Sequence, residues 1–116
     1  MRTILVVDDH GPYRATARAL LEAEGYDVVG EAVDGASAIA ETERLRPEIV
    51  LLDVQLPDID GFEVAARLTQ NKTRSQIVLI SSRAADVFGS LVGESGARGF
   101  VSKDELSGAA IEALVE

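Results

Sequence analysis

The chain has 116 residues, and its 20 acidic against 11 basic residues give a formal net charge of −9. This length suits one domain with a sizeable hydrophobic core. The negative charge argues against direct binding of this segment to a nucleic acid backbone. With no cysteine and one histidine, disulfides are excluded and a zinc site is not expected.

No membrane contact is expected from the sequence. The longest apolar runs fall far short of the roughly 20 residues that a membrane helix requires. No secretion signal is recognisable at Met1. We therefore expect a cytoplasmic domain that spans residues 1–116.

Short apolar runs alternate with amphipathic segments along the whole chain, beginning with a β-branched run that ends on Asp8. The expected strands are 3–7, 28–33, 49–53, 77–80 and 99–102. The run 49–52 is apolar on both faces, which is typical of a central strand of a parallel sheet covered by helices. The run 28–33 is less apolar and is expected near an edge.

The segments between the strands predict helices. The first helix is expected to begin near Gly11 and to end near Gly25. The other four are expected over 36–45, 61–69, 85–95 and 106–115. The segment 85–95 offers Val87, Phe88, Leu91 and Val92 for packing. Its two glycines each cost about 1 kcal/mol relative to alanine, so this helix is expected to be the least stable. Five strands alternating with five helices indicate a doubly wound (βα)5 parallel sheet of the α/β class.

Polar side chains follow four of these strands. Asp8 and Asp9 follow the first strand, Asp53 ends the third, and Ser81 and Lys103 follow the fourth and fifth. Because the carboxyl ends of parallel strands meet at one edge of the sheet, these groups should converge there.

Three carboxylates at one edge repel one another unless a cation lies between them. Mg²⁺ is the divalent ion that such oxygen ligands suit best. Lys103 and the Ser81 hydroxyl are suited to an anion carried by Asp53, and a phosphoryl group fits that role. Asp53 would then be the nucleophile that forms an acyl phosphate.

The whole chain resembles a receiver (CheY-like) domain of a two-component response regulator. The matching motifs are 6–9 (VVDD), 52–61 (LDVQLPDIDG), 80–82 (ISS) and 100–103 (FVSK). The segments 8–10, 29–32 and 96–100 are most similar to the NarL/FixJ-type branch, in which a helix-turn-helix (LuxR-type) output domain follows the receiver. The resemblance implies a flavodoxin-like sheet with strand order 2-1-3-4-5.

The resemblance also implies a role for each site residue. Asp53 would accept the phosphoryl group from a sensor histidine kinase. The Mg²⁺ ligands would be Asp9 directly, Asp8 through a water, Asp53, and the carbonyl of Gln55. Ser81 would be the switch hydroxyl, Ser82 its neighbour at the phosphoryl site, Phe100 the coupled aromatic residue and Lys103 the charge partner. Asp104 stands where many members have proline after a cis peptide bond.

The function implied is a signalling switch in which phosphorylation changes the surface of the fourth helix, the fifth strand and the fifth helix. A DNA-binding output domain would read that change, with dimerisation on phosphorylation. No enzymatic turnover is expected beyond the chain's own phosphorylation and slow dephosphorylation.

Three alternatives stay open from the residues alone. A receiver that is not phosphorylated would act through constitutive protein contacts. A Mg²⁺-dependent phosphohydrolase generally needs an acid two residues after its nucleophile, where this chain has Gln55. A flavodoxin-like cofactor binder needs a phosphate loop after the first strand, where Asp8 and Asp9 would repel phosphate.

Overall fold

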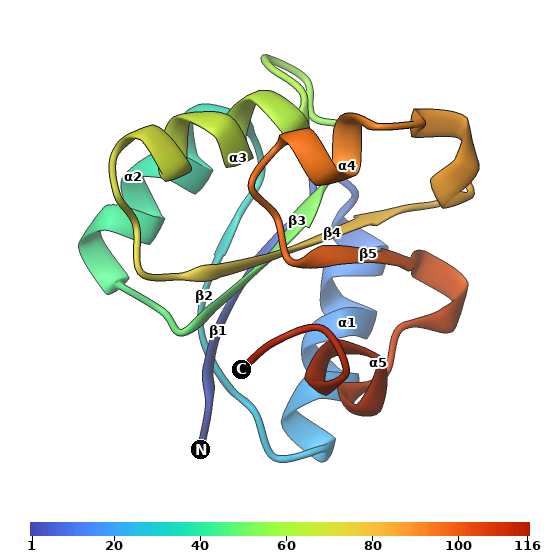
Figure 1. The fold of residues 1–116 in the computed structure, drawn as a ribbon. Helices are drawn as coiled ribbons and strands as arrows, with labels where there is room; N and C mark the ends of the chain where they lie inside the picture. The colour runs from blue at the N-terminus through green and yellow to red at the C-terminus, as the bar shows by residue number, and fades with distance from the viewer.

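The computed structural model describes residues 1–116 except the side chain of Ala85. Its five strands form one parallel sheet in the order β2-β1-β3-β4-β5, as the sequence predicted. The strands are β1 (Thr3–Val7), β2 (Asp27–Ala32), β3 (Ile49–Asp53), β4 (Gln76–Ser81) and β5 (Gly99–Ser102). The less apolar β2 lies at an edge and the fully buried β3 at the centre (Figure 1).

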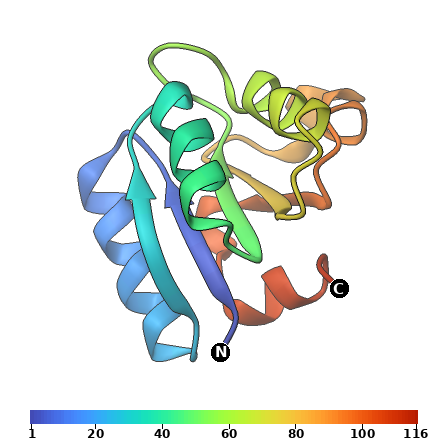
Figure 2. The same ribbon diagram turned by 90° about the vertical axis from the view of Figure 1, so that its left-hand side faces the viewer.

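Helices cover both faces of the sheet. They are α1 (Gly11–Ala23), α2 (Gly35–Leu45), α3 (Gly61–Gln70), α4 (Leu91–Glu94) and α5 (Gly108–Glu112), with 3₁₀ turns η1 (Ala85–Phe88) and η2 (Lys103–Glu105). Alternate residues of the strands pack on α1 and α5 on one face and on α2 and α3 on the other (Figures 1 and 2). Two covered faces explain why β1 and β3 are apolar at successive positions.

The helices begin where the sequence provides caps. The Asp34 side chain accepts from the Ser37 N–H at the start of α2, and Asp60 accepts from the Glu63 N–H at the start of α3. Ser107 does the same for α5. Each cap satisfies a backbone donor that has no partner within its helix.

The prediction of one continuous helix over 85–95 is wrong. The segment divides into η1 and the single turn α4, and Gly89 between them has a φ of 57°. Phe88 and Val92 pack against the sheet, but Val87 and Leu91 are 58% and 47% exposed. The low helix propensity of two glycines in eleven residues accounts for the interruption.

The last expected helix is shorter than 106–115. Leu106 is buried but precedes the helix, which begins after the Ser107 cap. The second strand is shifted to begin at Asp27, which leaves Val33 exposed. The peptide bond between Lys103 and Asp104 is trans.

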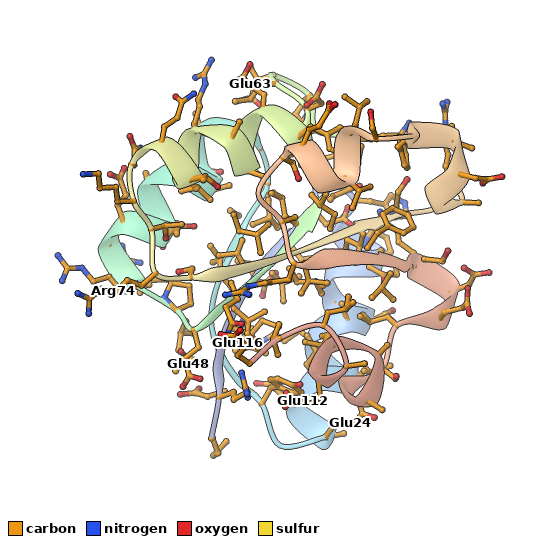
Figure 3. The ribbon with its side chains drawn as sticks, viewed as in Figure 1. Glu24, Glu48, Glu63, Arg74, Glu112 and Glu116 are labelled. Atoms are coloured by element: carbon orange, nitrogen blue, oxygen red, sulfur yellow. The ribbon has the colours of Figure 1, made fainter. Side chains whose placement is uncertain are left out.

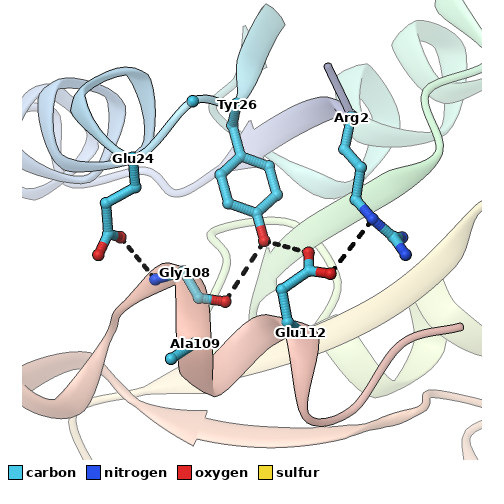
Figure 4. A pocket seen from close by; sticks show the side chains of 7 residues that line it. Arg2, Glu24, Tyr26, Gly108, Ala109 and Glu112 are labelled. Carbon is cyan, nitrogen blue, oxygen red and sulfur yellow. Dashed lines mark hydrogen bonds and ion pairs between the residues drawn. The ribbon is translucent and has the colours of Figure 1, made fainter.

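The beginning of α5 is tied to the α1–β2 connection (Figure 4). The Glu24 carboxylate accepts from the Gly108 N–H at 2.6 Å, and the Tyr26 hydroxyl donates to the Glu112 carboxylate. Arg2 Nε lies 3.4 Å from Glu112 Oε1. A hollow of about 410 Å³ lies among these side chains, at the end of the sheet away from Asp53.

The two chain ends meet at this same end of the sheet. Arg2 Nη2 donates to the Glu116 carbonyl at 2.7 Å, and the Glu116 N–H donates to Gln76 Oε1 at 2.7 Å. Glu48, Glu112 and Glu116 lie around this place in Figure 3. Among the helices that the structure describes, none has both the length and the apolarity needed to span a membrane.

Candidate functional site

The carboxyl ends of four strands bring the predicted site residues together. Asp8 follows β1, Asp53 is the last residue of β3, Ser81 is the last residue of β4, and Lys103 follows β5. A cavity of about 570 Å³ opens beside them, and its lining includes Asp9, Tyr13, Asp53, Gln55, Ser82 and Lys103. This is the crevice in which open α/β sheets bind their ligands.

Three carboxylates lie close together at this end of the sheet. Asp8 and Asp53 are buried, with 0% and 3% exposure, whereas Asp9 is exposed. One carboxylate oxygen of each lies within 4.8 Å of the others. Oxygen ligands this close together, open to solvent on the side of Asp9, suit a hard divalent cation that keeps part of its water shell.

Lys103 supplies the positive charge at the site. Its ammonium nitrogen lies 2.6 Å from Asp8 Oδ2 and 3.1 Å from Asp53 Oδ2. Burial alone would lower the pKa of Lys103, but the hydrogen bonds and charges of Asp8 and Asp53 outweigh it and raise the pKa. Lys103 is therefore a permanent cation between two buried acids.

Burial raises the pKa of Asp53 from 3.8 to about 6, and the nearby Asp8 charge acts in the same direction. The Gln55 N–H, which donates to Asp53 Oδ1 at 3.1 Å, and the Lys103 ammonium oppose this rise. With a pKa of about 6, most of the Asp53 carboxyl is ionised at neutral pH. The carboxylate is thus both poorly solvated and available as a nucleophile.

The two serines at the end of β4, Ser81 and Ser82, differ in exposure to solvent. Ser81 is fully buried, and its Oγ accepts from the Arg83 N–H at 3.1 Å, so the hydroxyl hydrogen is free to be donated elsewhere. Ser82 is exposed and lines the cavity. Both lie at the edge of the sheet where Asp53 ends its strand.

Phe100 does not line the cavity. It lies half-buried on the α3 side of the sheet, with its ring centre 5.7 Å from that of Phe88. Phe88 in turn lies 5.3 Å from Phe62 in an edge-to-face arrangement. Phe100 therefore connects β5 to η1 and α3 rather than to the carboxylates.

The loop after Asp53 is held closely against its own strand. The Gly61 N–H donates to the Val54 carbonyl at 2.7 Å, and a Cβ at Gly61 would collide with the carbonyl oxygen of Asp53. The Asp58 carboxylate accepts from the Gly35 and Ala36 N–H groups at 2.7 and 2.9 Å. These bonds lower the pKa of Asp58 to about 2.

Sequence reasoning missed two residues of α1 that contact the site. The Tyr13 hydroxyl donates to the Lys103 carbonyl at 3.1 Å. Arg14 Nη1 donates to the Asp8 carbonyl at 2.8 Å, and Arg14 Nε pairs with Glu31 at 2.7 Å. Tyr13 is 90 residues from its partner, so no local pattern could have predicted the contact.

The site thus combines a buried aspartate at the end of a central parallel strand with two further acids and a lysine. Residues 4–115 match the family described as the response regulator receiver domain. The chain therefore belongs to the receiver family of two-component response regulators, whose members are phosphorylation-activated switches. Receiver domains generally bind Mg²⁺ at an acidic pocket.

Two relatives of this chain are regulators of transcription. A transcriptional regulator of Pseudomonas aeruginosa is 38% identical over 105 residues, which is 90% of this chain and 51% of that protein. The DNA-binding transcriptional activator EvgA of Escherichia coli is 34% identical over 101 residues, covering 87% of this chain and 50% of that protein. The chain thus spans about half the length of these relatives.

Solved structures agree with the fold. A two-component response regulator of the LuxR family from Aurantimonas has a TM-score of 0.89 and 33% identity, covering 97% of this chain and 84% of that one. The signal receiver domain of NarL from Mycobacterium tuberculosis has a TM-score of 0.87 and 32% identity, covering 97% and 95%. The resemblance to the NarL and LuxR branch is thereby confirmed.

Proposed function

We propose that Asp53 is the phosphoacceptor of this receiver and that its phosphorylation requires Mg²⁺. One observation carries the proposal. The buried Asp53 carboxylate lies 3.1 Å from the Lys103 ammonium nitrogen, and one of its oxygens lies within 4.8 Å of an oxygen of each of Asp8 and Asp9. Asp8, Asp9, Asp53 and the Gln55 carbonyl are the proposed metal ligands.

The proposed reaction transfers a phosphoryl group without oxidation or reduction. A bond forms between an Asp53 carboxylate oxygen and phosphorus, and the bond from phosphorus to the donor's nitrogen or oxygen breaks. The bound cation would neutralise charge on the transferring phosphoryl oxygens. Lys103 already carries its proton, so its ammonium can move from the Asp53 carboxylate to a phosphoryl oxygen without proton transfer.

The Ser81 hydroxyl is proposed to donate to another phosphoryl oxygen, with Ser82 beside it. Ser81 is the last residue of β4 and pairs with Ser102 at the end of β5. A shift of Ser81 would be transmitted to β5 and to the Phe100, Phe88 and Phe62 contacts. The short η1 and α4, with exposed Val87 and Leu91, form the part of the surface that is expected to respond.

The partners follow from the family. A sensor histidine kinase is the proposed phosphoryl donor, and a cytoplasmic location follows from that role. Because the relatives are transcription regulators of about twice this length, the proposed output is a DNA-binding domain in a longer protein, with dimerisation on phosphorylation. Catalysis by this chain is proposed to extend only to its own phosphorylation and dephosphorylation.

The test is the intact mass after incubation with acetyl phosphate, with and without Mg²⁺. We expect the wild type to gain one phosphoryl group only with Mg²⁺, and Asp53→Asn to gain none. Asp60→Asn, which removes a carboxylate from the same loop outside the cavity, should still gain it. Uptake of phosphate by Asp53→Asn would contradict the proposed acceptor, and no uptake in any sample would favour a receiver that acts through constitutive contacts.

A further inference from the structure

Tyr13 contacts Lys103 at both ends of the lysine. Its hydroxyl donates to the Lys103 main-chain carbonyl at 3.1 Å, and its ring centre lies 4.6 Å from the Lys103 ammonium nitrogen. The first contact fixes the backbone where η2 begins, and the second faces the charged end of the side chain. Tyr13 thus contacts both the main chain and the charged end of Lys103, the residue that provides the positive charge of the site.

The ring is a third neighbour of the ammonium, beside the two carboxylates. Asp8 Oδ2 and Asp53 Oδ2 approach the nitrogen at 2.6 and 3.1 Å, and the Tyr13 ring lies 4.6 Å away. A lysine side chain has several rotatable bonds and holds one position only when its neighbours restrict it. The face of an aromatic ring attracts the cation without competing for a proton or for the phosphoryl oxygens.

The hydroxyl contact separates this arrangement from ordinary core packing. Tyr13 lies at the margin of the apolar cluster on the α1 side, where a leucine would fill similar space. Burial and the charges of Asp8, Asp53 and Asp104 raise the pKa of Tyr13 to about 12, so the phenol stays a hydrogen-bond donor at neutral pH. A packing role alone needs neither the hydroxyl nor the ring face.

We propose that Tyr13 is a positioning residue that directs the Lys103 ammonium towards Asp53, by its hydroxyl at the backbone and by its ring at the charge. This inference rests on the proposed function, in which Lys103 neutralises the phosphoryl group on Asp53. A displaced ammonium would stabilise the transferring group less well. Loss of Tyr13 should therefore slow phosphorylation while leaving the proposed metal ligands in place.

The position of Lys103 can be tested without phosphorylation. Lys72 and Lys103 are the two lysines of the chain, so protein labelled with ¹³C-lysine gives two sets of side-chain NMR signals. The aromatic ring current should displace the Lys103 Hε signals upfield of those of the exposed Lys72. Tyr13→Leu has no ring and gives the reference without a ring current, so its two sets should nearly coincide. Tyr13→Phe keeps the ring, and an intermediate position of its Lys103 signals would show that loss of the hydroxyl displaces the ammonium. Coincident signals in the wild type would overturn the inference.

The kinetic test compares initial rates of phosphorylation by acetyl phosphate at saturating Mg²⁺. We expect Tyr13→Leu to be slower by roughly tenfold, and Tyr13→Phe by a smaller factor. The affinity for Mg²⁺ alone should change less than about twofold in both variants, because a bound metal would contact the acids and not Tyr13. A general loss of structure would weaken both quantities together.

Tyr26→Phe is the matched control, because it removes the other tyrosine hydroxyl at the opposite end of the sheet. It should leave the phosphorylation rate unchanged. A wild-type rate in Tyr13→Leu would overturn this inference alone. A wild type that takes up no phosphoryl group would overturn the proposed function together with it.

Discussion

Lys103 lies closer to Asp8 than to Asp53: its ammonium nitrogen is 2.6 Å from Asp8 Oδ2 and 3.1 Å from Asp53 Oδ2. Asp8 is completely buried, and its other oxygen accepts from the His10 N–H at 2.8 Å. The Lys103 charge therefore neutralises Asp8 more strongly than Asp53, the proposed phosphoacceptor. Removal of the lysine would leave two buried carboxylates facing each other.

Lys103→Met is expected to destabilise the metal-free protein by about 2 to 4 kcal/mol at pH 7.5, because a buried ion pair loses one partner. Mg²⁺ should restore much of this loss, since the cation would take over the compensation of the acids. Urea unfolding with and without Mg²⁺ measures both effects. Lys72→Met is the control, because Lys72 is exposed and its replacement should cost less than about 0.5 kcal/mol. Equal stability of Lys103→Met and wild type would contradict the prediction.

Asp53→Asn should stabilise the protein at neutral pH. The folded protein retains the Asp53 proton up to a pH of about 6, whereas the unfolded chain releases it near 3.8. The contribution of Asp53 to the free energy of unfolding therefore falls as pH rises from about 4 to about 6 and stays low above that. The variant should be more stable by about 1 to 3 kcal/mol at pH 7.5 and nearly unchanged at pH 4.

The check is urea unfolding of wild type and Asp53→Asn at both pH values. Asp27→Asn serves as a control, because it removes an exposed carboxylate at the start of β2, away from the site. A gain of the same size at pH 4 and pH 7.5 would show that burial of the Asp53 charge is not its cause.

Gly61→Ala is expected to cost about 2 kcal/mol or more. The new methyl group would collide with backbone atoms of Asp53, the last residue of β3, and of Val54, whose N–H is bonded to the Ile80 carbonyl. Gly93→Ala is the matched control, because a Cβ there meets nothing within 4 Å in the short α4. That substitution should stabilise by about 0.5 kcal/mol through helix propensity. Thermal unfolding of both variants checks the prediction, and a larger loss in Gly93→Ala would contradict it.

Asp58→Asn is expected to lower the Tm, because the Asp58 carboxylate binds two N–H groups at the start of α2. Its pKa is depressed to about 2, so the stabilisation is complete above the unfolded value near 4 and is lost as pH falls through about 2. The difference in Tm between wild type and variant should therefore shrink below pH 4. A difference that persists unchanged at pH 2 would show that the charge plays no part.

The positions of the acids and the lysine could be predicted because each follows an apolar run that must be a buried strand. Once β1, β3, β4 and β5 are parallel, Asp8, Asp53, Ser81 and Lys103 must lie at one edge of the sheet. The distances among them could not be predicted, since they depend on side-chain conformations. The roles of these residues stay predictions until phosphorylation is measured.

The contacts of Tyr13 and the interruption between η1 and α4 could not be predicted from local patterns. Val87 and Leu91 are four residues apart, as are Phe88 and Val92, so the sequence favoured one continuous helix. Gly89 instead interrupts the segment with a φ of 57°, next to Phe88, whose ring packs against Phe62 and Phe100 from other elements. A sequence pattern indicates which residues are apolar, but the choice of partner is made by the tertiary structure.

The contact between Arg2 and Glu116 places both described chain ends side by side, and this bears on how a domain attached to either end could respond to the proposed phosphorylation. Both ends lie at the amino edge of the sheet, so an attached peptide, label or domain would begin at the opposite end of the sheet from Asp53. Such an attachment cannot sense the phosphoryl group by touching it where it starts. To respond to the proposed phosphorylation, it would have to contact the α4 and β5 surface through a linker.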